Sequence, residues 1–488
     1  MLMKQHTVCF LPEGIQCTVE SGTTLLQALR MARLHPDAPC GGNGSCGKCR
    51  VTVDHREVLA CQTQVDRDLT VMLPQNKERQ ILTWGRSTQV QPDGEYAYGL
   101  AIDIGTTTVV ACLLDGKTGE LLARKSCPNP QSQYGADVIS RIRYALSDSG
   151  DTLGSCIRGC LEQLTLAAAE EARIPVDSVT VAAIAGNTAM HHLLLGIDVK
   201  PLVTPPYMPG ACEAMELSAH QILPIGGTVR LLPNIAGFVG GDMVGCMLAT
   251  GFDRLEALTL MIDIGTNGEL VLGNRSRQIV CSTAAGPAFE GANISCGMCA
   301  VEGAIDHVWV EDGALRYHVI GEGTGVGICG SGLLDLVAAL LELGVIDESG
   351  HMQNKQYPLG DTQVMLTQKD VREVQLAKAS IRAGIELLTQ KMQVDLTDIR
   401  QVYLAGAFGS YMKPASACRI GMIPSCLQEQ IVPIGNAACE GAKLCALSRN
   451  AFDRCKSLAK GAEFLELASL PQFQDVFVDA MEFSEEAR

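Results

Sequence analysis

Four cysteines near the N-terminus have a spacing that suits a bound metal centre. Cys40, Cys46, Cys49 and Cys61 follow the pattern C-x5-C-x2-C-x11-C, and glycines fill the gaps between the first three. A [2Fe–2S] cluster needs thiolates that converge on two irons. Glycines let such a loop curl around inorganic sulfide and direct backbone N–H groups at it. The spacing therefore predicts a [2Fe–2S] cluster. Zinc, which usually takes two CxxC pairs, and plain thiols are the alternatives.

The segments around these cysteines predict a small domain of strands and one helix. Thr23 is the expected N-cap of a helix whose apolar residues begin at Leu25. Strands are predicted at 7–10, 15–19, 49–53 and 69–73. This order resembles the β-grasp [2Fe–2S] ferredoxins, and the short final gap resembles the ferredoxin modules of larger redox enzymes. The resemblance implies a domain over residues 1–76 with four cluster ligands, which are Cys40, Cys46, Cys49 and Cys61.

An apolar strand motif occurs twice further along the chain. Residues 100–106 are LAIDIGT and residues 260–266 are LMIDIGT, so six of seven positions are identical. Each copy predicts a buried strand, a tight glycine turn and a return strand, which could be no more than an ordinary hairpin. N–H groups and side chains of such turns can also bind phosphate, and Asp103 and Asp263 can hold a Mg²⁺ water shell or orient an attacking water. The candidate phosphate-binding residues are Gly105, Thr106, Thr107, Gly265, Thr266 and Asn267.

Other glycine-rich segments follow apolar strands. In residues 402–410 (VYLAGAFGS), the small residues Gly406, Ala407 and Gly409 permit close approach of a flat ligand such as adenosine. Segments 184–188 and 325–332, the second of which contains Gly330, precede apolar helices. A glycine-rich helix start can bind an anion, although helix–sheet packing also favours glycine. Gly330 is therefore a further candidate for nucleotide binding.

Together these motifs resemble the acetate and sugar kinase/Hsp70/actin (ASKHA) superfamily. The resemblance implies two RNase H-like α/β lobes with a nucleotide in the cleft between them. The expected chain is thus an α+β multidomain protein in which the ferredoxin domain is followed by two lobes. The expected parts after the ferredoxin domain are a linker at 77–97, lobe I at 98–255 and lobe II at 256–488.

The combination of the two parts resembles the reductive activators of corrinoid proteins over nearly the whole chain. Stretches that carry this resemblance lie at 40–49, 59–63, 133–141, 186–190 and 375–379. The resemblance implies an ATP-dependent enzyme that passes one electron from its cluster to a Co(II) corrinoid protein of a methyltransferase system and restores Co(I). The implied partners are that corrinoid protein and an upstream low-potential electron donor. The connection between the two parts is short, so no extra middle domain is expected.

Composition limits the remaining function classes. The net charge is −16, which argues against a nucleic acid as the main partner. No run of 18 apolar residues and no secretory signal are visible, so a cytoplasmic protein is expected. Most of the 21 cysteines are then expected to be thiols. The oligomeric state stays open, a homodimer included.

Two other functions are compatible with the same motifs. A small-molecule kinase with an accessory cluster would form a phosphorylated product, whereas a nucleotide-sensing electron-transfer protein would bind ATP without turnover. Asp242 is a further candidate for Mg²⁺ binding, and a structural role is the alternative. Cys296 and Cys299 form a lone CxxC that is better explained as a buried turn.

Overall fold

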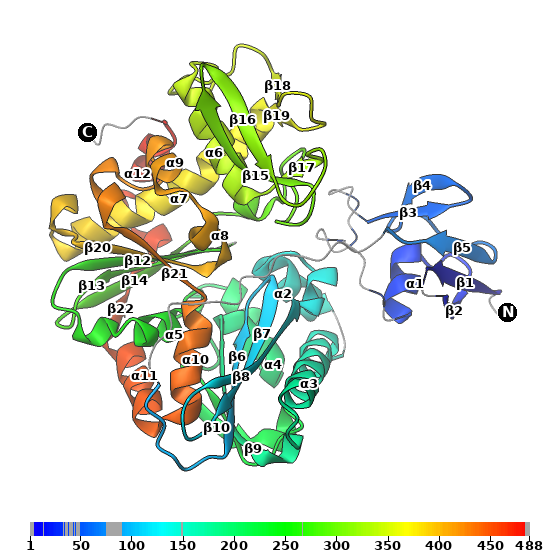
Figure 1. The fold of residues 1–488 in the computed structure, drawn as a ribbon, viewed down its shortest axis with the longest axis horizontal. Coiled ribbons are helices and arrows are strands. Elements are labelled where there is room, and N and C mark those ends of the chain that lie inside the picture. The colour runs from blue at the N-terminus through cyan, green and yellow to red at the C-terminus, as the bar shows by residue number, and fades with distance from the viewer. Residues whose placement is uncertain are drawn as a thin grey trace.

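The chain folds into a small N-terminal domain and a larger body of two lobes (Figure 1). The computed structural model describes residues 4–12, 14–32, 34, 38, 42, 44, 49–74, 90–147, 150–265 and 267–483, and only the backbone of Ala407. Cys40, Cys46 and Thr266 lie outside the described residues, as does the part of the predicted linker from 77 to 89.

The N-terminal domain is a five-stranded sheet with one helix packed on it. The strand order is β2-β1-β5-β3-β4, in which β1 pairs in parallel with β5 and antiparallel with β2. Apolar side chains of the sheet and of α1, such as Phe10 and Leu29, form its core. The predicted β-grasp fold is confirmed, but the N-cap is Thr24, whose Oγ1 accepts the N–H of Gln27, so the expectation of Thr23 is wrong. The elements are β1 (Gln5–Leu11), β2 (Ile15–Glu20), α1 (Leu25–Met31), β3 (Arg50–Val53), β4 (Arg56–Leu59) and β5 (Leu69–Met72).

Each lobe contains a six-stranded mixed sheet, and five strands of the two sheets share one topology, whereas the sixth strands, β10 and β22, lie at opposite ends. A meander of three antiparallel strands is extended by two parallel strands in both lobes. Lobe I has the order β10 (Met215–Ser218), β11 (Thr228–Leu231), β9 (Val179–Gly186), β6 (Tyr98–Ile104), β7 (Thr108–Asp115) and β8 (Leu121–Pro128). Lobe II has the order β21 (Ile431–Gly435), β20 (Gln401–Ala405), β12 (Thr259–Ile264), β13 (Gly268–Gly273), β14 (Gln278–Thr283) and β22 (Ala462–Phe464). The repeated sequence motif therefore corresponds to a repeated fold.

The first strands of the two sheets, β6 and β12, contribute to three separate cores. Side chains alternate between the two faces of a strand. Ile102 packs into an outer core of lobe I and Ile262 into an outer core of lobe II. Ala101 and Met261, by contrast, both pack into one core that the lobes share. The single position at which the two sequence motifs differ is thus the position that faces the shared core.

Helices cover both faces of each sheet. In lobe I, α3 packs on β7 and β8, and in lobe II, α7 packs on β13 and β14. Helix α10 follows β21 of lobe II but packs against β6 and β9 of lobe I. The helices are α2 (Val138–Ser147), α3 (Thr152–Ala172), α4 (Thr188–Leu195), α5 (Gly241–Ala249), α6 (Gly330–Glu342), α7 (Gln368–Met392), α8 (Gly406–Tyr411), α9 (Pro414–Arg419), α10 (Ala437–Leu447), α11 (Arg449–Gly461) and α12 (Phe473–Asp479).

Helices α5 and α10 cross between the two sheets at a pair of glycines. A Cβ on Gly441 of α10 would overlap the backbone of Gly245 in α5. Apolar side chains of both helices, including Met243 and Cys445, belong to the shared core. The absence of side chains at the crossing lets the helix backbones touch, and this close packing joins the lobes.

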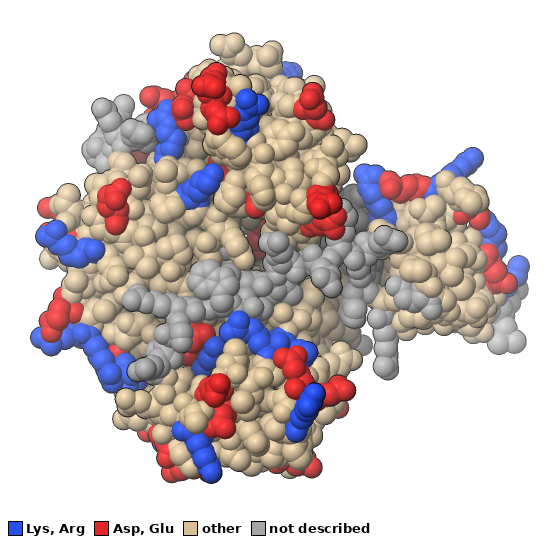
Figure 2. All heavy atoms as spheres, viewed as in Figure 1, with Lys and Arg blue, Asp and Glu red and all other residues tan. Residues whose placement is uncertain are grey.

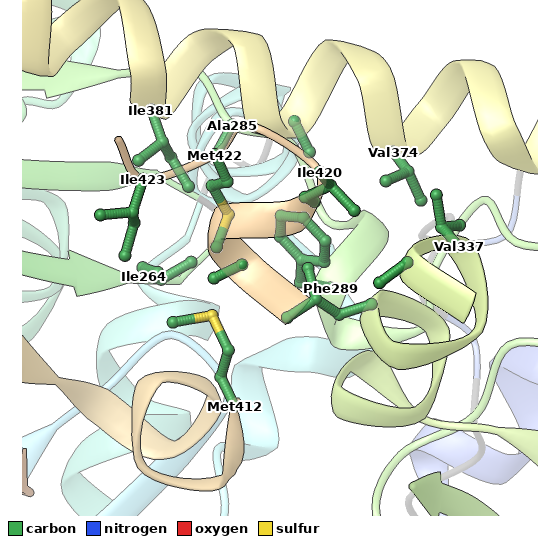
Figure 3. Close-up of a cluster of buried hydrophobic side chains, with 14 of the residues drawn as sticks. Ile264, Ala285, Phe289, Val337, Val374, Ile381, Met412, Ile420, Met422 and Ile423 are labelled. Atoms are coloured by element: carbon green, nitrogen blue, oxygen red, sulfur yellow. The ribbon is translucent and has the colours of Figure 1, made fainter. Parts of the chain in front are cut away.

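Lobe II carries an inserted part that the sequence did not predict. It consists of β15 (Ala304–Glu311), β16 (Ala314–Val319), β17 (Gly327–Ile328) and the hairpin of β18 (Gln356–Pro358) and β19 (Met365–Thr367). Figure 3 shows how the core of lobe II continues from the strand end at Ile264 to Phe289 and on to Val337 of α6 and Val374 of α7. This core holds the inserted part and the cavity wall together.

No disulfide joins the cysteines that the structure describes, and Cys426 is the exposed one among them. Among the described helices, none has the length and hydropathy of a membrane span.

The glycine crossing predicts an unequal response to the same substitution at two helical positions. We expect Gly441→Ala to lower the free energy of unfolding by about 1–3 kcal/mol, because the new methyl group meets backbone that cannot move aside. Gly159→Ala in α3 is the control, since nothing lies within 4 Å of its Cβ position, and it should stabilise by about 0.5–1 kcal/mol. Urea unfolding followed by circular dichroism measures both. Equal effects would contradict the crossing.

Candidate functional site

A cavity of about 350 Å³ lies between the two lobes at the ends of β6 and β12. Both copies of the repeated motif contribute to its wall, and so do the third motif and the start of α6. Predicted residues that line the cavity are Asp103, Gly105, Thr106, Thr107, Asp263, Gly265, Asn267, Gly330 and Gly406. The structure thus brings together predicted residues that are up to 303 positions apart, from Asp103 to Gly406.

The two motif aspartates face the same space because of strand alternation. Asp103 stands two residues after Ala101, and Asp263 two residues after Met261, so each points to the side of the shared core. Asp242, at the start of α5, joins them in the cavity wall. Three carboxyl groups therefore gather where the lobes meet.

Burial makes these carboxyl groups reluctant to ionise. Desolvation, with a smaller contribution from the charges of Asp242 and Asp263, raises the pKa of Asp103 to about 7 against the hydrogen bond from Asn436. The pKa of Asp263 is raised to about 7 by burial and by Asp242, and burial raises the pKa of Asp242 to about 6. The pKa of Glu269, also in the wall, is raised by burial and by the same neighbours. A cation in the cavity would favour the ionised forms.

The first glycine turn is held by its carbonyl groups. Asn129 donates its Nδ2–H to the carbonyl of Gly105 (2.8 Å) and its backbone N–H to the carbonyl of Thr107 (2.8 Å). Arg141 donates from Nη2 to the carbonyl of Thr106 (2.5 Å). In a planar trans peptide the N–H points away from the carbonyl of the same unit. Fixing these carbonyls therefore orients the N–H groups of the turn for an anion.

The second turn and the third motif meet at Asp263. The N–H of Gly265 bonds the carbonyl of Asn267 (3.0 Å), which closes the turn. Gly406 has φ of +80°, and a Cβ there would run into Oδ1 of Asp263. The predicted glycine-rich turn is in fact the first turn of α8. Gly409 does not line the cavity, because it packs on Leu404 of β20.

An apolar wall adjoins the polar end of the cavity. The rings of Phe289 and Phe408 stack with centroids 4.7 Å apart and planes 12° apart. Gly330 lies beside them, and a Cβ on it would overlap the carbonyl of Phe289. Packing alone thus requires glycine at this position. The wall suits a flat aromatic group such as a nucleobase.

Sequence reasoning missed two polar residues of the cavity. Asn436 donates its Nδ2–H to Oδ2 of Asp103 (2.8 Å) and caps α10 through the N–H of Cys439. A signal existed, because Gly435-Asn436 at the end of β21 matches Gly186-Asn187 at the end of β9, where Asn187 caps α4 and donates to Oγ1 of Thr106 (3.1 Å). Thr107 donates from Oγ1 to Oε2 of Glu290 across the cleft (3.0 Å). Nothing in the sequence marks Glu290.

In the N-terminal domain, the structure describes two of the four predicted cluster cysteines. Cys49 precedes β3 and Cys61 follows β4, and the N–H of Ala60 bonds the carbonyl of Cys49 (2.8 Å), so the hairpin register brings both to one end. Gly42, with φ of +107°, has its Cβ position 3.9 Å from Cβ of Cys61. The described part of the glycine loop therefore packs on a cysteine. This arrangement fits an iron–sulfur cluster, while Cys40 and Cys46 lie outside the described residues.

The raised pKa values predict how stability changes with pH. Between pH 4 and 7 the folded chain holds more protons on these carboxyl groups than the unfolded chain, so stability falls as pH rises. Asp242→Asn removes one such group, and it also removes the charge that raises the pKa values of Asp103 and Asp263. We expect the variant to be more stable than the parent by about 1–3 kcal/mol at pH 8 and little changed at pH 5. Urea unfolding in EDTA measures this, and an equal difference at both pH values would contradict it.

Three family models match successive parts of the chain. The 2Fe–2S iron–sulfur cluster binding domain matches residues 10–72, the RACo middle region matches 98–255, and the C-terminal domain of RACo, described as the ASKHA domain, matches 257–488. The RACo middle region thus coincides with lobe I, and its match begins after the short connection in which no extra domain was expected.

Relatives with similar domain content cover most of the chain. The corrinoid activation enzyme RamQ of Eubacterium limosum is 36% identical over 414 residues, which are 78% of this chain and 69% of the relative. The [Co(II) methylated amine-specific corrinoid protein] reductase of Methanosarcina barkeri is 28% identical over 78% of this chain and 76% of the relative. A solved structure described as a reductive activator for corrinoid, iron-sulfur protein matches 98% of both chains with a TM-score of 0.71 and 29% identity. The chain therefore belongs to the RACo family of reductive activators, with a [2Fe–2S] ferredoxin domain in front of a nucleotide-binding ASKHA body.

Proposed function

We propose that this protein is an ATP-dependent reductive activator that passes one electron from its [2Fe–2S] cluster to a Co(II) corrinoid protein of a methyltransferase system. The observation that carries the proposal is that one chain joins a ferredoxin domain to a body of two lobes, and that both copies of the repeated motif line the cavity between these lobes. The names of the relatives support the corrinoid acceptor. The transferred electron converts Co(II) to Co(I), and an upstream low-potential donor restores the reduced cluster.

The interlobe cavity is the proposed site of ATP and Mg²⁺. The turns at Gly105 and Gly265 offer N–H groups to phosphate oxygens, and the wall of Phe289 and Phe408 receives the base. Mg²⁺ prefers oxygen ligands and keeps several waters. Asp103 and Asp263 would hold its water shell or orient the attacking water, with Asp242 beside them. The other residues assigned to the nucleotide are Thr106, Thr107, Thr266, Asn267, Gly330, Gly406 and Ala407. Gly409 is left out of this assignment, because it packs on Leu404 and not on the cavity.

The cluster site is assigned to Cys40, Cys46, Cys49 and Cys61 in a ferredoxin domain over residues 1–76. The cluster supplies one-electron transfer when bound. The chain's own contribution among the described residues is the hairpin of β3 and β4, whose register brings Cys49 and Cys61 to one end of the domain. A linker at 77–97 would connect this domain to lobe I at 98–255 and lobe II at 256–488.

Coupling to ATP requires two states that bind the nucleotide with different affinity, since only such a difference shifts an equilibrium. The lobes joined at Gly245 and Gly441 supply a suitable hinge, and the Thr107–Glu290 bond marks their contact across the cleft. Acidic and basic side chains are interspersed over the face in Figure 2, which supports a protein partner better than a polyanion. We also propose that the chain assembles as a homodimer.

Replacing a cluster cysteine should separate the redox function from nucleotide binding. We expect Cys61→Ser to lose most visible absorption, iron and sulfide, and to form no Co(I), while ATP affinity stays within about 3-fold of the parent. Cys426→Ser, which alters an exposed thiol in lobe II, is the matched control and should behave as the parent. Unchanged absorption in Cys61→Ser would disprove the ligand assignment.

Replacing a motif aspartate should remove the dependence on ATP. We expect Asp263→Asn to slow phosphate release and ATP-dependent Co(I) formation by about 100-fold or more, since it removes a carboxylate that would hold the Mg²⁺ water shell or orient the attacking water. Asp312→Asn, in the exposed turn between β15 and β16, is the control. Release of free phosphate and a Co(I) spectrum with a corrinoid partner support the proposal. A phosphorylated product would favour a kinase, and binding without turnover would favour a sensor.

A further inference from the structure

The segment after β8 lies between the first phosphate turn and the N-terminal domain. It begins at Asn129, continues through the 3-10 turn Pro130–Gln133 and ends at Asp137, and we call it the relay segment (129–137). Its first residue, Asn129, is fully buried and bonds both Gly105 and Thr107 of the phosphate turn. Gln131 donates from Nε2 to the carbonyl of Leu153 in α3 (3.0 Å), so the segment is also fixed to the lobe.

Arg141 of α2 bridges the phosphate turn and the far end of the relay segment. Its side chain is 0% exposed, donates from Nη2 to the carbonyl of Thr106 (2.5 Å) and from Nε to the carbonyl of Gly135 (2.9 Å). Burial lowers the pKa of Arg141 to about 10, so the group stays cationic at neutral pH. A buried guanidinium needs its acceptors, and the planar fork fixes their relative positions. The two carbonyls are thus tied together through one rigid group.

The N-terminal domain contacts the relay segment between Asn129, which bonds the phosphate turn, and Gly135, which bonds Arg141. Arg30, on α1, donates from Nη2 to the carbonyl of Gln133, and its guanidinium lies 5.0 Å from the ring centroid of Tyr134. The Tyr134 ring in turn packs on Tyr144 of α2, with centroids 4.7 Å apart. Arg30 therefore docks on residues that directly precede Gly135, the second acceptor of Arg141.

Helix α1 also contacts the end of the domain where the described cluster cysteines lie. The N–H of Leu26 bonds the carbonyl of Ala60 (3.0 Å), and the N–H of Leu25 bonds the carbonyl of Thr63 (2.8 Å). These carbonyls flank Cys61 on both sides. The helix that carries Arg30 is thus attached to the backbone around a predicted cluster ligand.

We propose that Arg141 is a positioning residue that couples the first phosphate turn to docking of the ferredoxin domain through Arg30. The inference rests on the proposed function for the identity of the nucleotide. Phosphate bound to the N–H of Thr107 holds that peptide plane, and the carbonyl of Thr106 in the same plane is then held on Arg141. The guanidinium in turn holds Gly135 and the docking residues Gln133 and Tyr134. Linkage is reciprocal, so a docked ferredoxin domain strengthens nucleotide binding by the same factor by which the nucleotide strengthens docking.

A double-mutant cycle in the full-length protein tests this coupling without any corrinoid partner. The probe is a fluorescent ATP analogue with Mg²⁺, and the readout is its Kd in the parent, Arg30→Ala, Arg141→Lys and the double variant. Lysine keeps the charge but cannot bridge two carbonyls as the guanidinium fork does. We expect Arg30→Ala to weaken binding about 5-fold or more in the parent, and to have no effect when Arg141 is already lysine.

The controls separate coupling from a purely structural role. Arg67→Ala removes an exposed arginine of the same domain that pairs with Asp54, and it should leave the Kd unchanged. Independent, multiplicative effects of the Arg30 and Arg141 substitutions would overturn the inference while leaving the proposed function intact. If Arg141→Lys does not fold, Arg30→Ala alone decides, because an unchanged Kd in that surface variant overturns the coupling. A chain that binds no nucleotide at all overturns the proposed function together with this inference.

Discussion

The contact between α5 and α10 is the constraint on which the rest of the structure depends. Because Gly245 and Gly441 lack side chains, the two helix backbones touch, and the sheets on either side of them come to share one apolar core. In each strand that borders this core, every second side chain then points into it. The ends of β6 and β12 therefore open toward each other, and the polar residues at those ends form one cavity.

The chemistry of this cavity follows from the charge that the packing concentrates there. Asp103, Asp242 and Asp263 stand together in the cavity wall, and desolvation raises the pKa of each. These carboxyl groups therefore resist ionisation in the free cavity, and a cation that arrives with a polyphosphate would favour their ionised forms. The two glycine turns add N–H groups at the same place, and Asn129 and Arg141 bind the carbonyls of the first turn. Binding of the cation with its polyphosphate would thus also neutralise the charge of the three aspartates.

The N-terminal domain contributes through its position as well as through its thiols. Its helix α1 bonds the backbone around Cys61 at one end and reaches Gln133 with Arg30 at the other. The relay segment continues from this contact to the first phosphate turn by way of Asn129 and Arg141. Hydrogen bonds joined by short stretches of backbone thus connect the surroundings of Cys61 with the first glycine turn.

Local signals in the sequence indicated several elements and the candidate residues of both sites, but not the inserted part of lobe II. The cysteine spacing indicated the ferredoxin domain, and the repeat LAIDIGT/LMIDIGT indicated twin strand–turn units, because glycine turns and apolar strands are properties of a few adjacent residues. Only the tertiary structure decided that Asn436 bonds Asp103, that Glu290 meets Thr107 and that Arg141 bridges two carbonyls. These partners lie 333, 183 and 35 positions apart. The first two contacts depend on how α5 and α10 bring the two sheets together, and the third depends on where α2 lies beside the first glycine turn within lobe I. No spacing along the chain encodes any of them.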